Sequence, residues 1–299
     1  MNIVFTTARQ ELRSLRRERL PQALLAVFVG MVSISTFIGW LTNKNVTKIW
    51  QKVKQQGLTT APNPFAHVPS LYYLRNTVIY LVLVGALLAI VLGVASVMRD
   101  KKAHTLDLVL SRPVRYKQYV LGKLIGITAW LGMILGLVTI ISWISVSFII
   151  GKPLGSNDSG RLMAYFAMSL IFLLGFVLLG MICAVYSNRE TSALLLPISI
   201  WSLITFVLPQ LGTAEHPVSL LNPVPVIASQ GGVFSFLNSI LGPFSITEEY
   251  KKASSWILGN TDFVGKPGIS VPVLFLALLI GVFILMSSRR DRLRRSLYE

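Results

Sequence analysis

The chain has 299 residues, of which 53% are hydrophobic and only 13% are charged. Its mean hydropathy of +0.65 is higher than a water-soluble core of this length needs, so the composition excludes an ordinary soluble protein and indicates an integral membrane protein. The net charge is +16, but the basic residues flank long apolar runs. They are therefore typical of topology signals and of contacts with anionic lipid headgroups, rather than of a nucleic-acid-binding surface.

Six apolar runs are each long enough to cross a hydrocarbon core of about 30 Å as an α-helix, which rises about 1.5 Å per residue. The predicted spans are residues 24–42, 77–98, 124–150, 162–186, 193–211 and 271–287. The sequence therefore predicts an all-α, polytopic membrane protein with six transmembrane helices and a single transmembrane domain over residues 1–299.

The first 21 residues carry an amphipathic pattern. Apolar residues from Phe5 to Leu15 recur at spacings of three and four, and arginines occupy positions between them. This pattern predicts that residues 1–21 form an interfacial elbow helix, which lies in the plane of the membrane surface and ends near Pro21.

The connections between the spans differ in composition. Residues 43–76 are polar, carry lysines and are broken by prolines, which predicts a short amphipathic helix followed by an irregular loop. Residues 151–160 have the composition of a turn-forming loop. Glycine and proline interrupt the apolar part of residues 212–270, which favours one or two helices that lie on or dip into the membrane over a seventh span. Within this region, the pattern of residues 246–258 predicts a surface amphipathic helix.

Six spans place both termini on the same side of the membrane. The termini, residues 99–123 and the connection at Arg189 carry 18 of the 28 lysines and arginines, which leaves 10 for the other side. Because basic residues are enriched in cytoplasmic loops, this bias predicts a multi-pass protein of the cytoplasmic (inner) membrane with both termini in the cytoplasm. Residues 43–76 and 212–270 are then external segments.

Between their flanks the predicted spans contain no Asp, Glu, Lys, Arg or His. A proton- or ion-coupled carrier normally needs such a residue or a broken helix near the middle of the membrane, so the sequence gives this class little support. Enzyme classes lose support because phosphate-binding, zinc-protease and nucleophile-elbow motifs are missing, and no catalytic residue can be named. We expect no metal site, since the only cysteine, Cys183, lies in an apolar run and the three histidines lie in different loops.

The link between the second and third predicted spans is the most informative stretch. It reads DKKAHTLDLVLSRPVRYKQYVLGK and covers residues 100–123. Leu106, Val109 and Leu110 form an apolar face at helical spacing, which predicts a short amphipathic helix on the cytoplasmic side. Pro113 disfavours helix at the residue before it and suits the first turn of a new helix. A rigid helix, corner and helix at the base of two spans can pass a push from outside the membrane into those spans.

This link resembles the first cytoplasmic loop of the membrane subunits of ABC-2 type ATP-binding-cassette transporters. The family pattern is close to E-R-E-x-G-T-L-x-x-L-L-(S/A)-x-P-(V/I), followed by a turn and a G-K pair that opens the third helix. The matching residues are Asp100, Thr105, Leu106, Val109, Leu110, Ser111, Pro113, Val114, Gly122 and Lys123. The chain departs from the pattern at Lys102, where glutamate is usual, and at His104, where glycine is usual. Within the family, this form of the loop resembles that of the single-domain permeases, which include the membrane subunit of the nitrous oxide reductase maturation system.

The resemblance implies how the chain works. Two permeases, identical or related, pair in the membrane with two separate ATP-binding subunits, which hold the ATP and magnesium, while this chain binds no cofactor and no nucleic acid. Hydrolysis of ATP on the partner chain drives export of a substrate, so this chain is not itself an enzyme. The residues expected to contact the ATPase, as a coupling helix, are Asp100, Thr105, Leu106, Asp107, Val109, Leu110, Arg112 and Pro113. Membrane lipid is a further expected partner, and the substrate-binding residues stay unknown.

Two other classes stay open. A non-transporting membrane scaffold or anchor would dock an external protein on its external segments, and a permease with an external accessory protein would do so as well. Partner ATP hydrolysis that is sensitive to changes in residues 105–113 would argue against the scaffold. A channel or ion-coupled carrier would give conductance or gradient-driven flux from this chain alone. Polar and aromatic side chains in the spans, such as Ser145 and Trp201, are compatible with a substrate path and equally with packing.

Overall fold

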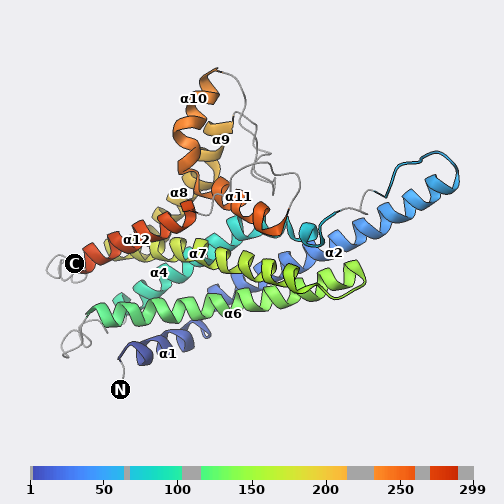
Figure 1. The fold of residues 1–299 in the computed structure, drawn as a ribbon. Coiled ribbons are helices and arrows are strands. Elements are labelled where there is room, and N and C mark those ends of the chain that lie inside the picture. Colours follow the sequence, from blue (N-terminus) through green and yellow to red (C-terminus); the bar gives the residue numbers. More distant parts are fainter. Residues whose placement is uncertain (1–2, 64–67, 103–115, 214–231, 260–269, 289–299) are drawn as a thin grey trace.

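The computed structural model describes residues 3–63, 68–102, 116–213, 232–259 and 270–288. Within these ranges every regular element is a helix and there is no strand, so the predicted all-α class is confirmed. The helices form an elongated bundle, from which α2 projects at one end (Figure 1).

The helices follow one another in the order α1 (Ile3–Leu15), α2 (Arg19–Gln55), the 3₁₀ turn η1 (Ser70–Leu74), α3 (Thr77–Tyr80), the π-helical turn η2 (Leu81–Gly85), α4 (Ala86–Lys102), α6 (Tyr116–Ile150), α7 (Ser156–Tyr186), α8 (Glu190–Ser202), the π-helical turn η3 (Leu203–Val207), α9 (Leu208–Thr213), α10 (Gly232–Leu241), the 3₁₀ turn η5 (Gly242–Phe244), α11 (Ile246–Leu258) and α12 (Ser270–Ser288). Five stretches are long and apolar enough to cross a membrane, namely Pro21–Gln55, Ser70–Lys102, Gln118–Ile150, Ser156–Tyr186 and Glu190–Gln210, and Ser270–Phe283 in α12 is a shorter apolar helix. The described residues therefore hold five to six candidate spans.

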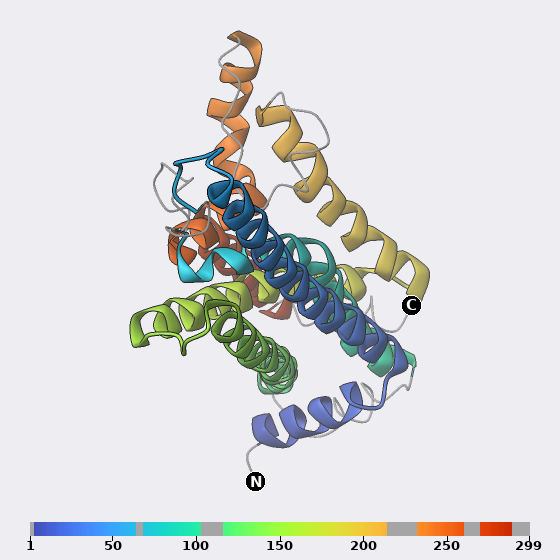
Figure 2. The same cartoon turned by 90° about the vertical axis from the view of Figure 1, so that its right-hand side faces the viewer.

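The N-terminal segment divides earlier than the sequence predicts. α1 ends at Leu15, a short turn follows, and α2 begins at Arg19, so the predicted end of the first helix near Pro21 is wrong. Pro21 is the third residue of α2, where the missing N–H of proline removes no hydrogen bond because the first turn of a helix offers it no backbone acceptor. Figure 2 shows α1 turned away from the axis of α2 at the lower end of that helix.

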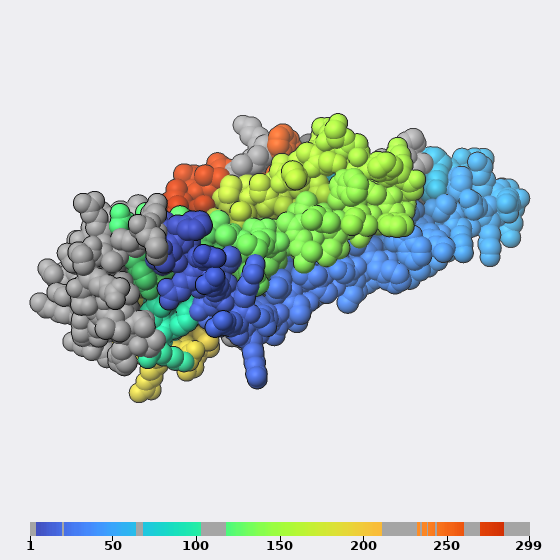
Figure 3. All heavy atoms as spheres, turned by 90° about the horizontal axis from the view of Figure 1, so that it is seen from below, coloured from blue at the N-terminus to red at the C-terminus, as the bar shows by residue number. Residues whose placement is uncertain are grey.

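α2 is longer than the predicted first span. It has 37 residues and runs without a break to Gln55, so it measures about 55 Å against a hydrocarbon core of about 30 Å. In Figure 3 its far end extends past the end of α6. Residues 40–56 contain no glycine or proline, and Lys44 lies over the Trp40 ring at 4.9 Å from the centroid. The polar residues therefore continue the helix until Gly57, whose φ is 69°.

The connection between α6 and α7 is shorter than the predicted loop of residues 151–160. Gly151, with φ of 72°, ends α6 in the left-handed conformation that glycine adopts readily. α7 then begins at Ser156 and has Asp158 in its first turn, where a carboxylate interacts favourably with the helix dipole. The second half of the predicted loop is therefore helical.

α7 lies at the centre of the bundle and touches α4 backbone to backbone. A Cβ atom added at Gly93 of α4 would overlap the carbonyl oxygen of Val177, and one added at Gly180 of α7 would lie 2.6 Å from the carbonyl oxygen of Ile90. Two helices can approach this closely only where neither carries a side chain at the crossing. The contact fixes α7 against α4 along much of their shared length.

α11 (Ile246–Leu258) confirms the predicted helix at residues 246–258, but it packs into the bundle, so its predicted place on the surface is wrong. Tyr250 stacks on Phe172 of α7 with ring centroids 4.2 Å apart, and its hydroxyl hydrogen-bonds the Ser169 hydroxyl at 2.7 Å. Glu248 and Lys251 are both buried and form an ion pair of 2.7 Å within α11. The polar sequence looks like a surface helix, but pairing of its charges allows most of its circumference to be covered.

We predict that Gly93→Ala or Gly180→Ala destabilises the folded protein by about 1–3 kcal/mol, because the added methyl group overpacks a backbone contact. Gly132→Ala is the matched control, since nothing lies within 4 Å of a Cβ atom at that position of α6. Thermal unfolding of the purified variants in mild detergent measures the difference. A control variant as unstable as the other two would contradict the close α4–α7 crossing.

Candidate functional site

The last four residues of α4 form the most connected polar site in the described chain. They are Arg99, Asp100, Lys101 and Lys102, and we call them the α4 junction. Each side chain of the junction bonds to a different part of the protein. Consecutive helix residues are about 100° apart around the axis, so the four side chains together reach most of the way around α4.

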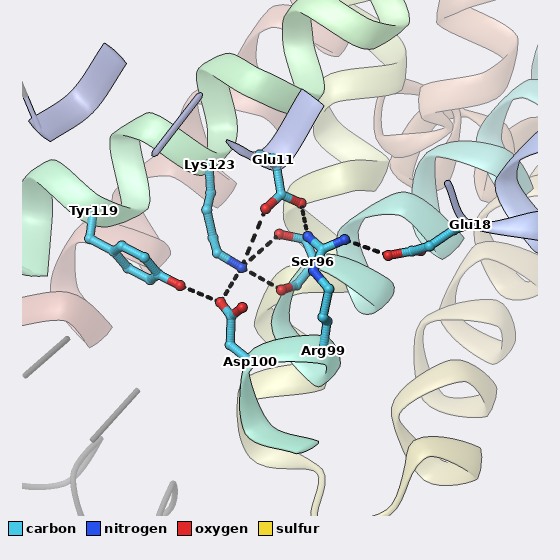
Figure 4. A network of polar contacts seen from close by, with 7 residues as sticks. All are labelled: Glu11, Glu18, Ser96, Arg99, Asp100, Tyr119 and Lys123. Carbon is cyan, nitrogen blue, oxygen red and sulfur yellow. Dashed lines mark hydrogen bonds and ion pairs between the residues drawn. The ribbon is translucent and has the colours of Figure 1, made fainter. Parts of the chain in front are cut away.

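Arg99 connects α4 to α1 and to the start of α2. Its guanidinium pairs with the carboxylate of Glu11 in α1 and with that of Glu18, the residue that immediately precedes α2 (Figure 4). Glu11 is only 4% exposed. A guanidinium can serve two carboxylates at once because it presents five donors in one plane. The contact therefore fixes the angle at the turn between α1 and α2.

Asp100 connects α4 to α6. Its carboxylate pairs with the Lys123 ammonium and accepts a hydrogen bond from the Tyr119 hydroxyl (Figure 4). The Lys123 side chain is 5% exposed, and its Nζ also donates to the carbonyl oxygen of Ser96 and lies 3.6 Å from Oε2 of Glu11. Lys123 thus joins both carboxylates of a buried network whose members come from α1, α4 and α6.

Lys101 connects α4 to α7, and Lys102 connects α4 to α8. Lys101 Nζ donates to the carbonyl oxygens of Val185 at 2.9 Å and Ser187 at 3.0 Å, at the C-terminal end of α7. These carbonyls lack partners within the helix, and a cation there also interacts favourably with the helix dipole. Lys102 pairs with Glu190 in the first turn of α8, but both side chains are exposed, so this last contact is weak.

Two glycines of α6 bring α1 close enough for the network to form. A Cβ atom at Gly122 would lie 2.7 Å from Cβ of Thr7, and one at Gly126 would lie 2.8 Å from the carbonyl oxygen of Ala8. The two glycines are four residues apart and so share one face of the helix. α1 rests on this face, and Lys123, next to Gly122, then reaches Glu11.

Only one of the residues predicted to contact an ATPase lies in the described part of the chain. Asp100 is in the buried network, facing Lys123. The others, Thr105, Leu106, Asp107, Val109, Leu110, Arg112 and Pro113, lie outside the described residues, so their role stays a prediction. Sequence reasoning missed Glu11, Glu18 and Tyr119. The available signal was that Glu11 and Glu18 are the only acidic residues of the basic segment 1–21.

The described residues show no cluster that could hold a metal ion. No group of three His, Cys, Asp or Glu residues there is placed to hold a metal ion. Every carboxylate of the junction network is paired with a basic side chain. The arrangement therefore joins helix ends mechanically.

The long apolar helices and this junction define a multi-pass helical membrane protein in which α4 is linked to five other helices at one end. The chain belongs to the ABC-2 family of transporter proteins, since the family model described as ABC-2 family transporter protein matches residues 5–288. That range runs from α1 to the last residue of α12, and it confirms the predicted ABC-2 type membrane subunit. A search of curated proteins found no match.

We predict that Lys123→Met destabilises the protein by about 3–5 kcal/mol, because it leaves the carboxylates of Asp100 and Glu11 without their shared partner in a buried site. Lys102→Met removes the same charge from the exposed pair with Glu190 and costs at most about 1 kcal/mol. Denaturant titration of both variants in mixed micelles gives the two free energies of unfolding. Equal, small losses would show that the network does not stabilise the fold.

Proposed function

We propose that the chain is the permease subunit of an ATP-driven ABC-2 type exporter of the cytoplasmic membrane. Hydrolysis of ATP takes place on a separate ATP-binding subunit, and the α4 junction passes the movement of that subunit into the spans. The supporting observation is the position of the junction. It ends at Lys102, directly before residues 103–115, which carry most of the resemblance to the family's ATPase contact.

Both ends of the segment 103–115 are attached to the same network. Its N-terminal end continues from the α4 junction, and its C-terminal end leads into α6, where Tyr119 and Lys123 bond to Asp100. A force on this segment therefore acts on α4 and α6 together. Arg99 and Lys101 pass it on to α1, the start of α2 and the end of α7.

The buried pairs suit transmission better than loose contacts would. Lys123 and Glu11 are each at most 5% exposed, so separating them from their partners leaves charges in a poorly solvated place at a large energetic cost. The helix ends consequently move as one body, and the movement is passed on to the far ends of the spans. α1 lies on the cytoplasmic membrane surface in this proposal, and both termini are cytoplasmic.

The energy source follows from what the predicted spans lack. They contain no ionisable residue between their flanks, so a proton or ion gradient has no side chain to act on within them. The family resemblance supports ATP hydrolysis on a partner chain as the energy source. A second permease, identical or related, completes the complex by analogy with the family.

We predict that an ATP-binding subunit copurifies with the natural chain in mild detergent and is lost from the variant Leu106→Arg with Leu110→Arg, because two charges disrupt the apolar face of the predicted coupling helix. The control is Gln51→Arg with Gln55→Arg, which adds the same charge at the exposed far end of α2 and leaves the partner bound. Mass spectrometry of the purified complexes identifies the partner. Absence of any such subunit from the natural complex would favour the scaffold alternative.

A further inference from the structure

A groove lies between α2 and α6, far from the α4 junction. Its walls are residues 33–40 of α2 and residues 144–149 of α6, and its volume is about 360 Å³. That volume is within the range of small-molecule binding sites, about 300–1,000 Å³. Figure 3 shows α2 and α6 side by side along this face of the molecule. Both walls belong to candidate membrane spans, so we expect the groove to face the hydrocarbon of the membrane.

The lining is apolar with a few hydroxyl groups. Phe37, Trp40 and Phe148 supply aromatic surface, and Phe37 and Phe148 are 60% and 79% exposed. The hydroxyls of Ser33 and Thr36 each donate to a backbone carbonyl of the preceding turn at 2.9 Å, so they need no further partner. Such a lining suits an uncharged apolar chain, such as an acyl chain.

Three lysines lie in the sequence just beyond the residues that line one end of the groove, and we call them the cationic rim. Lys44 Nζ lies over the ring of Trp40, 4.9 Å from its centroid, and Lys48 is one helical turn further along the same face of α2. Lys152 lies two residues after the end of α6, and all three lysines are exposed. Residues 43–76 contain no Asp or Glu, so Lys44 and Lys48 have no acidic neighbour within their own segment, whereas Asp158 lies six residues after Lys152.

We propose that the groove binds an anionic membrane amphiphile, with an acyl chain between α2 and α6 and its negative headgroup at Lys44 and Lys48. The depth of the site fits this orientation. Lys44 comes just after residue 42, the predicted end of the first span, where a lipid headgroup lies. A purely apolar ligand would not use the rim, and a water-soluble anion would not fill the groove. Binding is a property of this chain alone and does not depend on the ATPase.

The test uses the full-length protein in phosphatidylcholine nanodiscs that contain a small fraction of phosphatidylglycerol with a diazirine in its acyl chain. A second sample contains phosphatidylcholine with the same diazirine chain. After illumination, mass spectrometry maps the labelled residues. We expect labelling concentrated on residues 33–40 and 144–149, with the anionic probe preferred over the zwitterionic one.

Three variants separate the acyl-chain contact from the headgroup contact. Ser145→Phe fills the groove and lowers labelling by both probes, whereas Ile140→Phe, on an exposed part of α6 that does not line the groove, leaves labelling unchanged. Lys44→Gln reduces the preference for phosphatidylglycerol about fivefold, the effect expected of one lysine near a membrane surface. Lys54→Gln removes the same charge further along α2 and keeps the preference.

Three results would overturn the proposal. Labels spread evenly over the lipid-facing residues of α2 and α6 would mean ordinary annular lipid. Equal labelling by the two probes in the natural protein would mean that the lysines do not select a headgroup. Cross-links from residues 144–149 to a second permease would mean that another copy of the chain fills the groove.

Discussion

The arrangement of the helices on the α1 side depends on one buried ammonium group. Lys123 lies between the carboxylates of Asp100 and Glu11, and Arg99 holds Glu11 from the other side. Charges removed from water are tolerated only when they are paired, and breaking one pair leaves the other charge buried without a partner. Since the partners come from α1, α4 and α6, none of these three helix ends can shift alone without exposing an unpaired charge. The network thus helps to set the positions of these helix ends.

The rest of the bundle is built around the same helix. α4 and α7 touch at Gly93 and Gly180, and Lys101 binds the last carbonyls of α7, so α7 is held to α4 along its length and at its end. α1 is held on α6 through the small face at Gly122. A membrane interior offers little hydrophobic gain on helix association, and close packing together with polar links at helix ends takes over that role. The segment 103–115 enters this assembly at its most connected point, which is why we propose it as the input of a transport cycle.

The sequence predicted the helical class and the approximate places of the spans, because long apolar runs carry a signal that needs no knowledge of neighbours. The predictions from sequence were wrong where contacts with other parts of the chain determine the length or burial of a helix. The polar end of α2 continues as a helix because no glycine or proline interrupts it before Gly57, and α11 is buried because Glu248 and Lys251 neutralise each other. The sequence predicted only part of the α4 junction. Lys123 stood in a recognised motif, but its partner Glu11 is more than 100 residues away in the chain, and no local pattern connects the two.

The most direct test of the account is a distance measurement by double electron-electron resonance in the complex with the ATP-binding subunit. Spin labels at Phe5 of α1 and Leu195 of α8, both exposed positions, with Cys183 replaced by alanine, report two helices that both bond to the α4 junction, through Glu11 and through Glu190. ATP should change this distance in the natural junction, and the change should disappear in Asp100→Asn although the partner still binds. An unchanged response to ATP in Asp100→Asn would contradict the claim that the junction transmits the movement.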